Sequence, residues 1–522
     1  MMKLNKLIVF LAAASLALPA TRLAANSLDT GASVVVVYNT REKDSEGVAR
    51  HYAARRIVPK QNLIGLALPP TEEITRAEFI TLLQRPLLAE MEKRKLFTFE
   101  DGRVTDSQIR YLTLCYGVPL KIKRDVGLIE QNTDQLPEPL RKKNEASVDS
   151  ELSWLPRSKG HVPLNGAIAN VFYGTSNLFN FHSTNGVLMV GRLDGPTPVL
   201  AKRLVDFAIS AETNGFWGNA YIDLRGITEG EYARGDSWLR AAATAAKSYG
   251  MDTIIDEREA TFPTGFPLGH AGFYAGWYSE FVTGPFAEKT AEFTTGAVAY
   301  HLHSFSANTV RDENRNWVGP LVAQGATAVL GSVYEPFLAG TPDIGVFADR
   351  LLNHGYSLGE AAYAAERSIS WMSTVVGDPM YRPCGRHPRL LHEDLTARGR
   401  TADLEWSNLR VVNLNLMKGT APTNMINYLA AVPGVRESSL MLEKIGDLYD
   451  LSSQDENAAR AWAMALQQRQ STQQHKRLIL KTADRLVKLG RKDEAKKLYQ
   501  LFLQKFPTHP DAKAVAAKAD KL

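Results

Sequence analysis

The stretch that decides the fold is "SVVVVYNTREKDSEGVARHYAARR", residues 33–56. Its four consecutive valines, Val34 to Val37, are typical of a β-strand buried on both faces, because a half-exposed strand alternates apolar with polar residues. A polar loop follows, and residues 48–56 then have the composition of a helix that Pro59 stops. This strand–loop–helix unit predicts an α/β fold.

The same unit recurs along the chain. Apolar runs that predict further buried strands lie at residues 109–120, 186–194, 219–226, 252–257, 271–279, 296–304 and 326–336. Strands that alternate with helical segments favour a mostly parallel wound sheet with helices on both faces. We therefore predict an α/β domain over residues 30–395, in which the charged, Asn- and Pro-rich residues 121–170 form an excursion from the sheet.

The N-terminus has the features of a secretory signal peptide. Lys3 and Lys6 precede an apolar segment from Leu7 to Ala20, and small residues follow it. We expect residues 1–25 to be removed and the mature protein to be secreted or periplasmic. An uncleaved anchor is the alternative, and no later stretch approaches the roughly 20 apolar residues that span a bilayer.

The pattern changes after Pro383. Residues 396–436 are predicted to form a connector, in which the alternating stretch 404–417 is expected to be a strand, and residues 437–522 are predicted to be all-α. An offset of 37 residues relates one set of positions in this last region to another, namely Gly446, Tyr449, Ala458, Trp462 and Ala465 to Ala483, Leu486, Ala495, Tyr499 and Phe502. The pattern resembles tetratricopeptide repeats; a pair of ordinary helical hairpins is the alternative.

The charge distribution bears on possible partners. The formal net charge of +5 does not indicate a nucleic-acid-binding protein. Residues 437–522 hold 16 Lys and Arg against 11 Asp and Glu. We therefore expect the helical repeats to bind a protein partner, and their surplus charge favours an acidic peptide or an anionic envelope polymer.

Ligands of wound sheets bind beyond the carboxyl ends of the strands, so the polar residues at those ends are the candidate site. The candidate catalytic residues are His301, His303, Ser304, Asp223 and Glu335, and the candidate ligand-binding residues are Asn39, Ser45, Arg192 and Arg225. His301 and His303 are two residues apart and would face the same way if the strand continues that far.

Three interpretations of the histidine cluster remain open. A histidine could be a general base, with a serine or water as the nucleophile and a carboxylate that orients the base. The His-x-His pair could instead bind a divalent metal together with Glu335 or Asp223. In the third interpretation the histidines belong to a hydrogen-bonded network that holds the loops. No cofactor is identified, since the sequence has no Gly-x-Gly-x-x-Gly and no phosphate-binding loop.

Three other motifs favour ordinary structural roles. Asp149 and Glu151 could share one face for acid–base work, but such stretches are more often solvated edges. Cys115 lies inside an apolar strand and is expected to pack rather than react. Ser357 matches a nucleophile elbow by letter, but a helix precedes it, so we expect Ser357 and Glu360 to form a capping box.

Several segments carry a resemblance to the caspase-like α/β fold of gingipain-type cysteine peptidases: "GAVAYHLHSFSA", "GATAVLGSVYEP", "LNHGYSLGEAAYAA" and "VVGDPMYRP". In those peptidases a His-Gly follows one strand and a catalytic Cys follows the next. Here the corresponding places are "AGWYS", with Gly276 and Trp277, and "HLHSFS". Neither the catalytic His nor the Cys matches, so the resemblance does not imply peptidase activity.

The chain also resembles an uncharacterised family of secreted bacterial proteins from species that carry exosortase. The matching segments, over about residues 34–383, include "YLTLCYGVPL", "SVDSEL", "GRLDGPT", "GNAYIDLRG" and "VGDPMYRP". The resemblance implies a location and a context but no reaction. We therefore expect an exported envelope protein that is either a hydrolase or a binder of surface proteins or polymers; the alternative is a non-catalytic scaffold that acts through its helical repeats.

Overall fold

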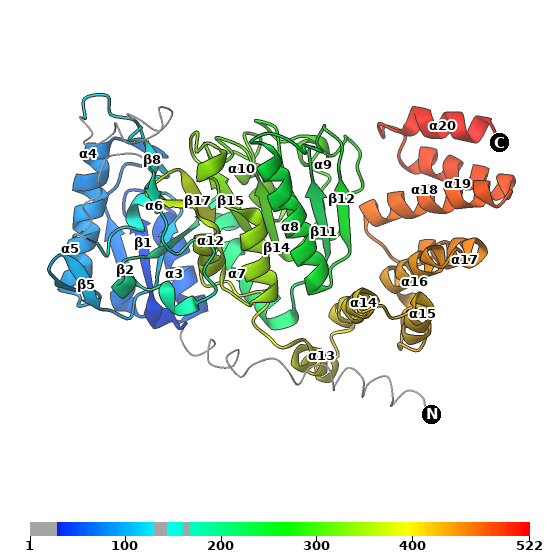
Figure 1. Cartoon of the computed structure of the whole chain (residues 1–522), viewed down its shortest axis with the longest axis horizontal. Coiled ribbons are helices and arrows are strands. Elements are labelled where there is room, and N and C mark those ends of the chain that lie inside the picture. The colour runs from blue at the N-terminus through cyan, green and yellow to red at the C-terminus, as the bar shows by residue number, and fades with distance from the viewer. Residues whose placement is uncertain (1–28, 129–142, 158, 160–166) are drawn as a thin grey trace.

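The centre of the molecule is a ten-stranded sheet, which the computed structural model shows from β2 at one edge to β12 at the other (Figure 1). The structure describes residues 29–128, 143–157, 159 and 167–522. The strands lie in the order β12 (Thr253–Asp256), β11 (Asn219–Asp223), β13 (Ala271–Gly276), β14 (Phe293–His301), β15 (Ala328–Ser332), β17 (Ser373–Val376), β10 (Met189–Leu193), β6 (Tyr111–Cys115), β1 (Val34–Asn39) and β2 (Leu63–Leu66). The predicted, mostly parallel α/β sheet is confirmed.

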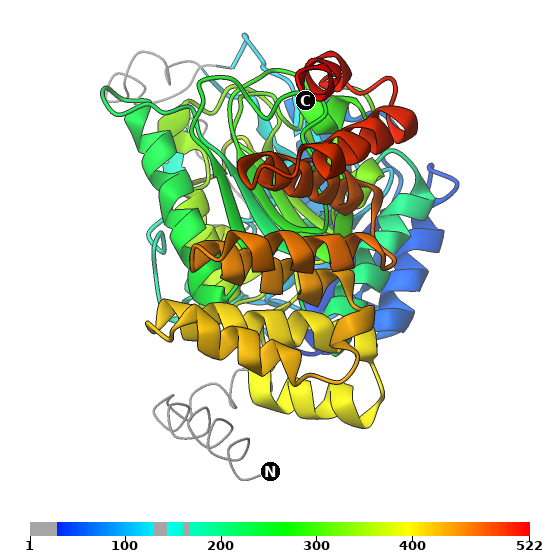
Figure 2. The same cartoon turned by 90° about the vertical axis from the view of Figure 1, so that its right-hand side faces the viewer.

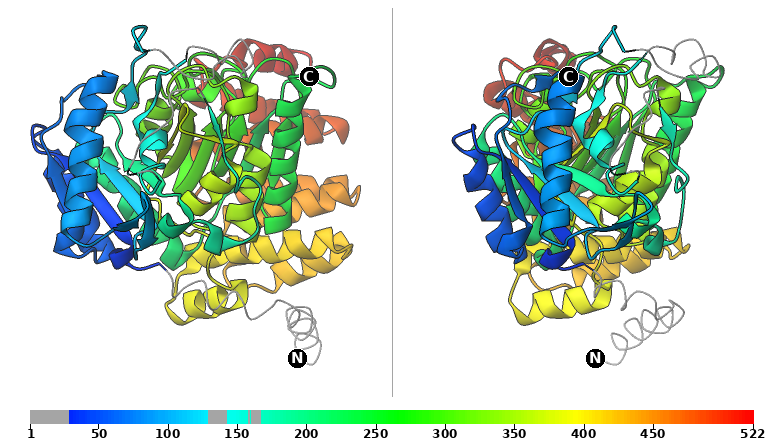
Figure 3. Two further views of the ribbon diagram at one scale, coloured as in Figure 1. Left: turned by 60° about the vertical axis from the view of Figure 1, so that its left-hand side comes forward. Right: turned by 90° about the vertical axis from the view of Figure 1, so that its left-hand side faces the viewer.

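The four valines of β1 are buried on both faces, as predicted. Val34 and Val36 belong to the apolar cluster that contains Tyr52 of α3 (Ser45–Arg56), whereas Val35 and Val37 pack in the cluster of α5 (Arg85–Lys93). Figure 3 shows these N-terminal helices against the blue strands. Because successive residues of a strand point to opposite faces, the valine run requires a helix on each side.

Helices cover both sides of the strands (Figure 2). The longer ones are α7 (Pro198–Asn214), which contacts β10 and β14, and α8 (Ala233–Tyr249), which contacts β11 and β13. The shorter ones are α4 (Arg76–Glu78), α6 (Val148–Leu152), α9 (Gly284–Ala287), α10 (Val318–Gln324), α11 (Ile344–Ala348) and α12 (Leu358–Ala365). The capping box predicted at the start of α12 is confirmed, since Ser357 and Glu360 bond each other's backbone N–H groups.

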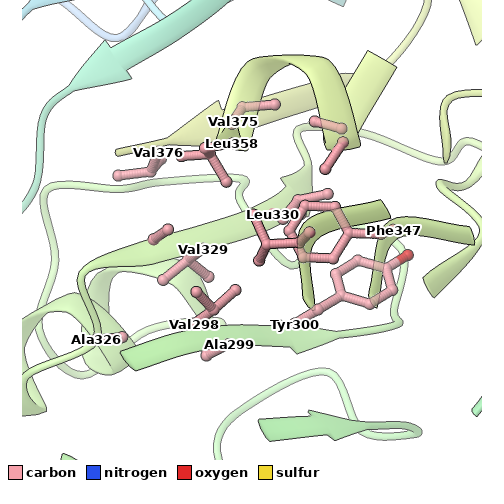
Figure 4. Close-up of a cluster of buried hydrophobic side chains, with 14 of the residues drawn as sticks. Val298, Ala299, Tyr300, Ala326, Val329, Leu330, Phe347, Leu358, Val375 and Val376 are labelled. Carbon is pink, nitrogen blue, oxygen red and sulfur yellow. The ribbon is translucent and has the colours of Figure 1, made fainter. Parts of the chain in front are cut away.

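Strands β2 and β17 were not predicted from the sequence. β17 runs antiparallel to β15 and meets β10 at the single pair Val376 and Arg192, so it joins the two halves of the sheet. Around it β14, β15, α11 and α12 contribute apolar side chains to one close-packed cluster (Figure 4). This packing lets a strand of four residues hold the centre of a large sheet.

Small sheets flank the main one. They consist of β3 (Glu73–Ile74) with β7 (Lys121–Ile122) and β8 (Ala146–Ser147), of β4 (Thr98–Glu100) with β5 (Arg103–Asp106), and of β9 (Ile168–Ala169) with β16 (Ser368–Ile369). The residues 129–142, 158 and 160–166 of the predicted excursion lie outside the described residues, as does the predicted signal peptide.

The C-terminal part is all-α, as predicted for residues 437–522, and helices also occupy residues 388–430, which the prediction assigned to the end of the α/β domain and to the connector. Its helices are α13 (Pro388–Ala397), α14 (Thr401–Met417), α15 (Pro422–Ala430), α16 (Ser439–Leu451), α17 (Asp455–Leu466), α18 (Thr472–Lys488), α19 (Lys492–Lys505) and α20 (Ala512–Asp520). They stack beside the β12 edge of the sheet (Figures 1 and 2). Within the described residues, none of the helices is long and apolar enough to cross a membrane.

The strand predicted at residues 404–417 is wrong, because this stretch lies within helix α14. The strand was predicted because Val412, Leu414 and Leu416 alternate with asparagines, and apolar residues at every second position are typical of a strand. The buried residues of α14 instead lie at 407–409 and 412–413, which is a helical spacing. The asparagine at 413 donates a hydrogen bond to the Gly250 carbonyl, so a residue that looked like the polar side of a strand binds the α/β domain.

The 37-residue offset is visible in the contacts of the helix pairs. Trp462 donates a hydrogen bond to Asp447, which also binds Lys481. The positions 37 residues later repeat the arrangement, with Tyr499, Asp484 and Lys518. The small residue Gly446 is required, since a Cβ there would lie 2.3 Å from the Trp462 indole.

Candidate functional site

The carboxyl ends of the strands in both halves of the sheet share one edge. Arg311, in the segment after β14, bonds Asp194 after β10 and the Val118 carbonyl after β6. The edge is long, however. Asn39 on β1 lies seven strand intervals from Asp223 on β11, which is about 34 Å at about 4.8 Å per interval. The candidate residues therefore fall into separate groups.

One group is a buried layer formed by β11, β13 and β14. Asp223 lies beside Gly276, and Gly276 beside His301, in the register of these parallel strands. Two intervals put Asp223 and His301 about 10 Å apart. A Cβ on Gly276 would lie 2.6 Å from the Tyr274 hydroxyl and 2.9 Å from the Asp223 Cβ. Glycine thus allows Tyr274, two residues earlier on the same face, to reach between Asp223 and His301.

His301 is enclosed by aromatic side chains. Its Nδ1 lies 2.8 Å from the Tyr274 hydroxyl, and its ring stacks on Trp317 with 3.3 Å between centroids and 7° between planes. It is 1% exposed. Burial, with a smaller effect from His303, lowers the pKa of His301 well below its usual value, so the ring is neutral at pH 7. Its Nε2 has no hydrogen-bond partner among the described residues.

Asp223 is also buried, and only one of its two carboxylate oxygens accepts a hydrogen bond from a described group. Its Oδ2 accepts a hydrogen bond from the Phe262 N–H at 3.0 Å, while no described group bonds Oδ1. Burial raises the pKa of Asp223 to about 7, and nearby Asp256 acts in the same direction. Burial therefore favours the protonated, neutral form of this carboxyl.

A second layer lies at the surface above the first. The His303 ring contacts Tyr278 edge-on at 4.7 Å, and the Arg225 guanidinium lies 4.8 Å from the Tyr278 centroid on another side. His303 Nδ1 hydrogen-bonds the Ser304 carbonyl, and burial lowers the pKa of His303, an effect that Glu280 and Glu335 oppose. Among the described residues, no hydrogen bond joins the Ser304 hydroxyl to either histidine.

Exposed aromatic residues lie on loops at the same edge of the sheet. We call them the aromatic rim: Tyr232 (54% exposed), Tyr278 (44%), Phe281 (44%) and Phe305 (37%). They lie on the loops that follow β11, β13 and β14. Phe305 adopts a left-handed backbone conformation with φ of 60°, which is uncommon for a bulky residue, and its N–H donates to the Tyr334 carbonyl.

The remaining ligand-binding candidates hold the fold together. The Asn39 amide bonds four backbone groups, those of Arg41, Leu68, Pro69 and Gly117, and the Ser45 hydroxyl accepts from the Asn39 N–H. With every polar atom of these two buried side chains engaged inside the protein, the predicted ligand-binding role has no support in their geometry.

Arg192 lies at the centre of a buried charge network. It is fully buried and bonds Asp149, Asp194 and the carbonyls of Val118 and Pro119. Asp149 is thus a buried carboxylate paired with Arg192, not a solvated residue as expected. Glu151 is also buried and pairs with the buried Arg76 at 3.0 Å. All donors of Arg192 are engaged on the β6 and β10 side of the sheet, and Asp194 carries the network across to Arg311 in the segment after β14.

The surroundings of Cys115 do not favour a reactive thiol, and the described residues do not form a metal site. Cys115 is a fully buried free thiol in β6, and burial raises its pKa, which opposes thiolate formation. In the part of the chain that the structure describes, no three His, Cys, Asp or Glu side chains come together as metal ligands.

Sequence reasoning missed the aromatic partners of the histidines. Tyr274 and Trp317 lie in segments that were read only as a strand and a helix, 27 residues before and 16 residues after His301. The segment "FYAGWYS" carried the one signal for the position of Tyr274. Tyr274 precedes Gly276 by two residues, so both lie on the same face of the strand.

No protein-family model and no curated protein matches the chain. A solved structure described as a protease is similar at a TM-score of 0.37 and 11% sequence identity, over 68% of this chain and 79% of that chain.

Proposed function

We propose that the protein is an exported binding protein whose surface layer and aromatic rim hold a partner at the carboxyl edge of the sheet. The observation that carries this proposal is the enclosure of His301, which lies fully buried between Trp317 and Tyr274 where the strand β14 ends. A general base must reach the proton that it abstracts, and a neutral, buried ring stacked on an indole cannot meet a substrate.

His303, which is half-buried, has no hydroxyl or thiol bonded to its ring among the described residues. Its Nδ1 donates to the Ser304 carbonyl, which makes Nε2 the basic nitrogen, and a catalytic pair requires a hydroxyl or thiol within hydrogen-bond distance of that nitrogen. Exposed tyrosine beside arginine is instead typical of binding surfaces, where large amphipathic side chains provide most of the affinity. Arg225 over Tyr278, with the exposed Phe281 and Phe305 on the loops after β13 and β14, has this composition.

The location of the proposed binding follows from the N-terminal residues. Lys3, Lys6 and the apolar segment that follows support export to the periplasm or medium, and the exosortase-linked resemblance supports an envelope context. The partner would then be a surface protein or polymer, and the α/β domain would be a caspase-like framework without the peptidase dyad. The helical repeats would provide a second contact with a protein.

Sedimentation with isolated envelope tests the proposal. Mature protein should co-sediment with cell-wall and outer-membrane fractions, and Tyr278→Ala combined with Arg225→Ala should reduce the bound fraction at least tenfold. Phe179→Ala is the matched control, since Phe179 is an exposed aromatic (66%) near Ser33 and Arg110, which lie at the opposite ends of their strands. Equal loss in the control, or no loss in the double variant, contradicts the proposal.

A hydrolase is the second candidate, and one observation favours it: Asp223 and His301 each keep a buried polar atom without a partner among the described residues. Turnover of labelled casein or of p-nitrophenyl esters and glycosides decides between the two. We expect no turnover above blank. Turnover that Asp223→Asn abolishes, in a variant that remains folded, would establish the enzyme instead.

A further inference from the structure

Strand β12 forms one edge of the main sheet, and no backbone hydrogen bond reaches its outer side from any of the described residues. The Asp252 and Asp256 carbonyls accept hydrogen bonds from the N–H groups of Ala220 and Leu224 in and after β11. In a parallel pair every second residue bonds the neighbour, so Thr253 and Ile255 direct their N–H and C=O groups away from the sheet. Unpaired edges of this kind are templates for another strand.

A groove lies between this end of the sheet and the C-terminal helices. Its volume is about 450 Å³, within the range of ligand-binding pockets. The α/β side provides Thr253, Ile254 and Phe266, and the helical side provides Trp406, Leu409 and Leu440. Thr253 at the start of the edge strand and these apolar side chains therefore face the same space, with Asn219 and Tyr221 of β11 beside them.

The charged side chains of the groove neutralise one another. Lys444 pairs with Asp252, Arg477 with Glu443, and Lys481 with Asp447. Three cations and three anions leave no net charge in the groove, so the positive surplus of residues 437–522 lies on other surfaces of the helices. A strongly charged ligand would have to break these pairs, whereas an uncharged segment would not.

We propose that this groove binds an extended, uncharged segment of a partner polypeptide, which adds to β12 as a further strand. Its backbone would exchange hydrogen bonds with Thr253 and Ile255, and alternate apolar side chains would point toward Ile254, Trp406 and Leu440. This inference concerns a site separate from the aromatic rim and does not depend on the function proposed there.

Proline substitution separates backbone pairing from side-chain effects. Thr253→Pro removes an outward N–H, and proline is tolerated at the first residue of an edge strand. Thr253→Val keeps that N–H with a side chain of the same shape. Random heptapeptides displayed on phage would be selected on each purified full-length protein, and the enriched peptide would be measured by fluorescence anisotropy in a free and a backbone N-methylated form.

We expect enrichment of alternating, uncharged sequences on the wild type and on Thr253→Val, a loss of affinity of at least tenfold for Thr253→Pro, and a similar loss for the N-methylated peptide. Melting curves would confirm that Thr253→Pro is folded, and the N-methylated peptide gives the same test without altering the protein. No enrichment on the wild type, equal affinity for Thr253→Pro and the wild type, equal affinity for both peptide forms, or a β12-dependent dimer in sedimentation velocity would overturn the proposal.

Discussion

Replacing Asp223 by asparagine should change how stability depends on pH. Asp223 is 1% exposed, its Oδ1 has no partner among the described residues, and burial raises its pKa to about 7. In the unfolded chain an aspartate has a pKa of about 3.9. Because the folded value is the higher one, the native state binds a proton more tightly, and this contribution to stability is lost as the pH rises from about 4 to about 7.

The size of the effect follows from the width of that window. Each pKa unit corresponds to about 1.4 kcal/mol, so the wild type should lose about 3 kcal/mol through Asp223 between pH 5 and pH 8. The Asp223→Asn variant cannot ionise and should lose nothing there. The asparagine amide could change the unfolding free energy by a constant amount. That amount is the same at both pH values, so it cancels when only the change with pH is compared. Burial also raises the pKa of Glu366, to about 8, but Glu366 is present in both proteins.

Urea unfolding at pH 5 and pH 8, followed by tryptophan fluorescence, measures this difference. We expect the free energy of unfolding of Asp223→Asn, relative to wild type, to rise by about 3 kcal/mol from the lower to the higher pH. Asp101→Asn, on an exposed turn, is the control and should show no such rise. A relative stability of Asp223→Asn that is the same at both pH values would refute the assignment of a raised pKa to this carboxyl.

Three further substitutions test the packing. Trp317→Ala should lower the unfolding free energy by about 3–5 kcal/mol in urea melts because it opens a cavity beside His301, and Trp317→Phe should lose less than half as much. Gly446→Ala should cost about 1–3 kcal/mol in thermal melts because its Cβ would overlap the Trp462 indole, whereas Gly47→Ala in α3, whose Cβ would meet the Lys202 amine at an ordinary 3.6 Å, should be neutral or stabilising. Ser357→Ala should cost about 1 kcal/mol through loss of the helix cap and leave envelope binding unchanged. A Ser357→Ala variant that loses binding at full stability would point to a functional hydroxyl.

Features that depend on neighbouring residues in the chain could be predicted. The burial of Val34 to Val37, the cap formed by Ser357 and Glu360, and the close helix contact at Gly446 each follow from local composition and spacing. The position of His301 and Asp223 at the carboxyl ends of neighbouring strands also follows from the strand pattern.

The site could be predicted only in part, because its character comes from residues distant in the sequence. From the sequence Arg192 is a ligand-binding candidate, whereas in the structure it pairs with Asp149 and with Asp194, which also binds Arg311. The short strand β17 carries too few residues to be recognised without β15 beside it.

The sequence alone determined the class of the fold, since a buried strand must be apolar wherever it lies and a repeat must return at its period. Only the tertiary structure decided what the histidines do. A histidine at the end of a strand is compatible with catalysis, metal binding or packing, and the choice depends on what lies against the ring. Here Trp317 and Tyr274 enclose His301, while His303 remains at a surface of exposed aromatics. Burial sets the charge and reach of an imidazole, and burial is a property of the folded chain.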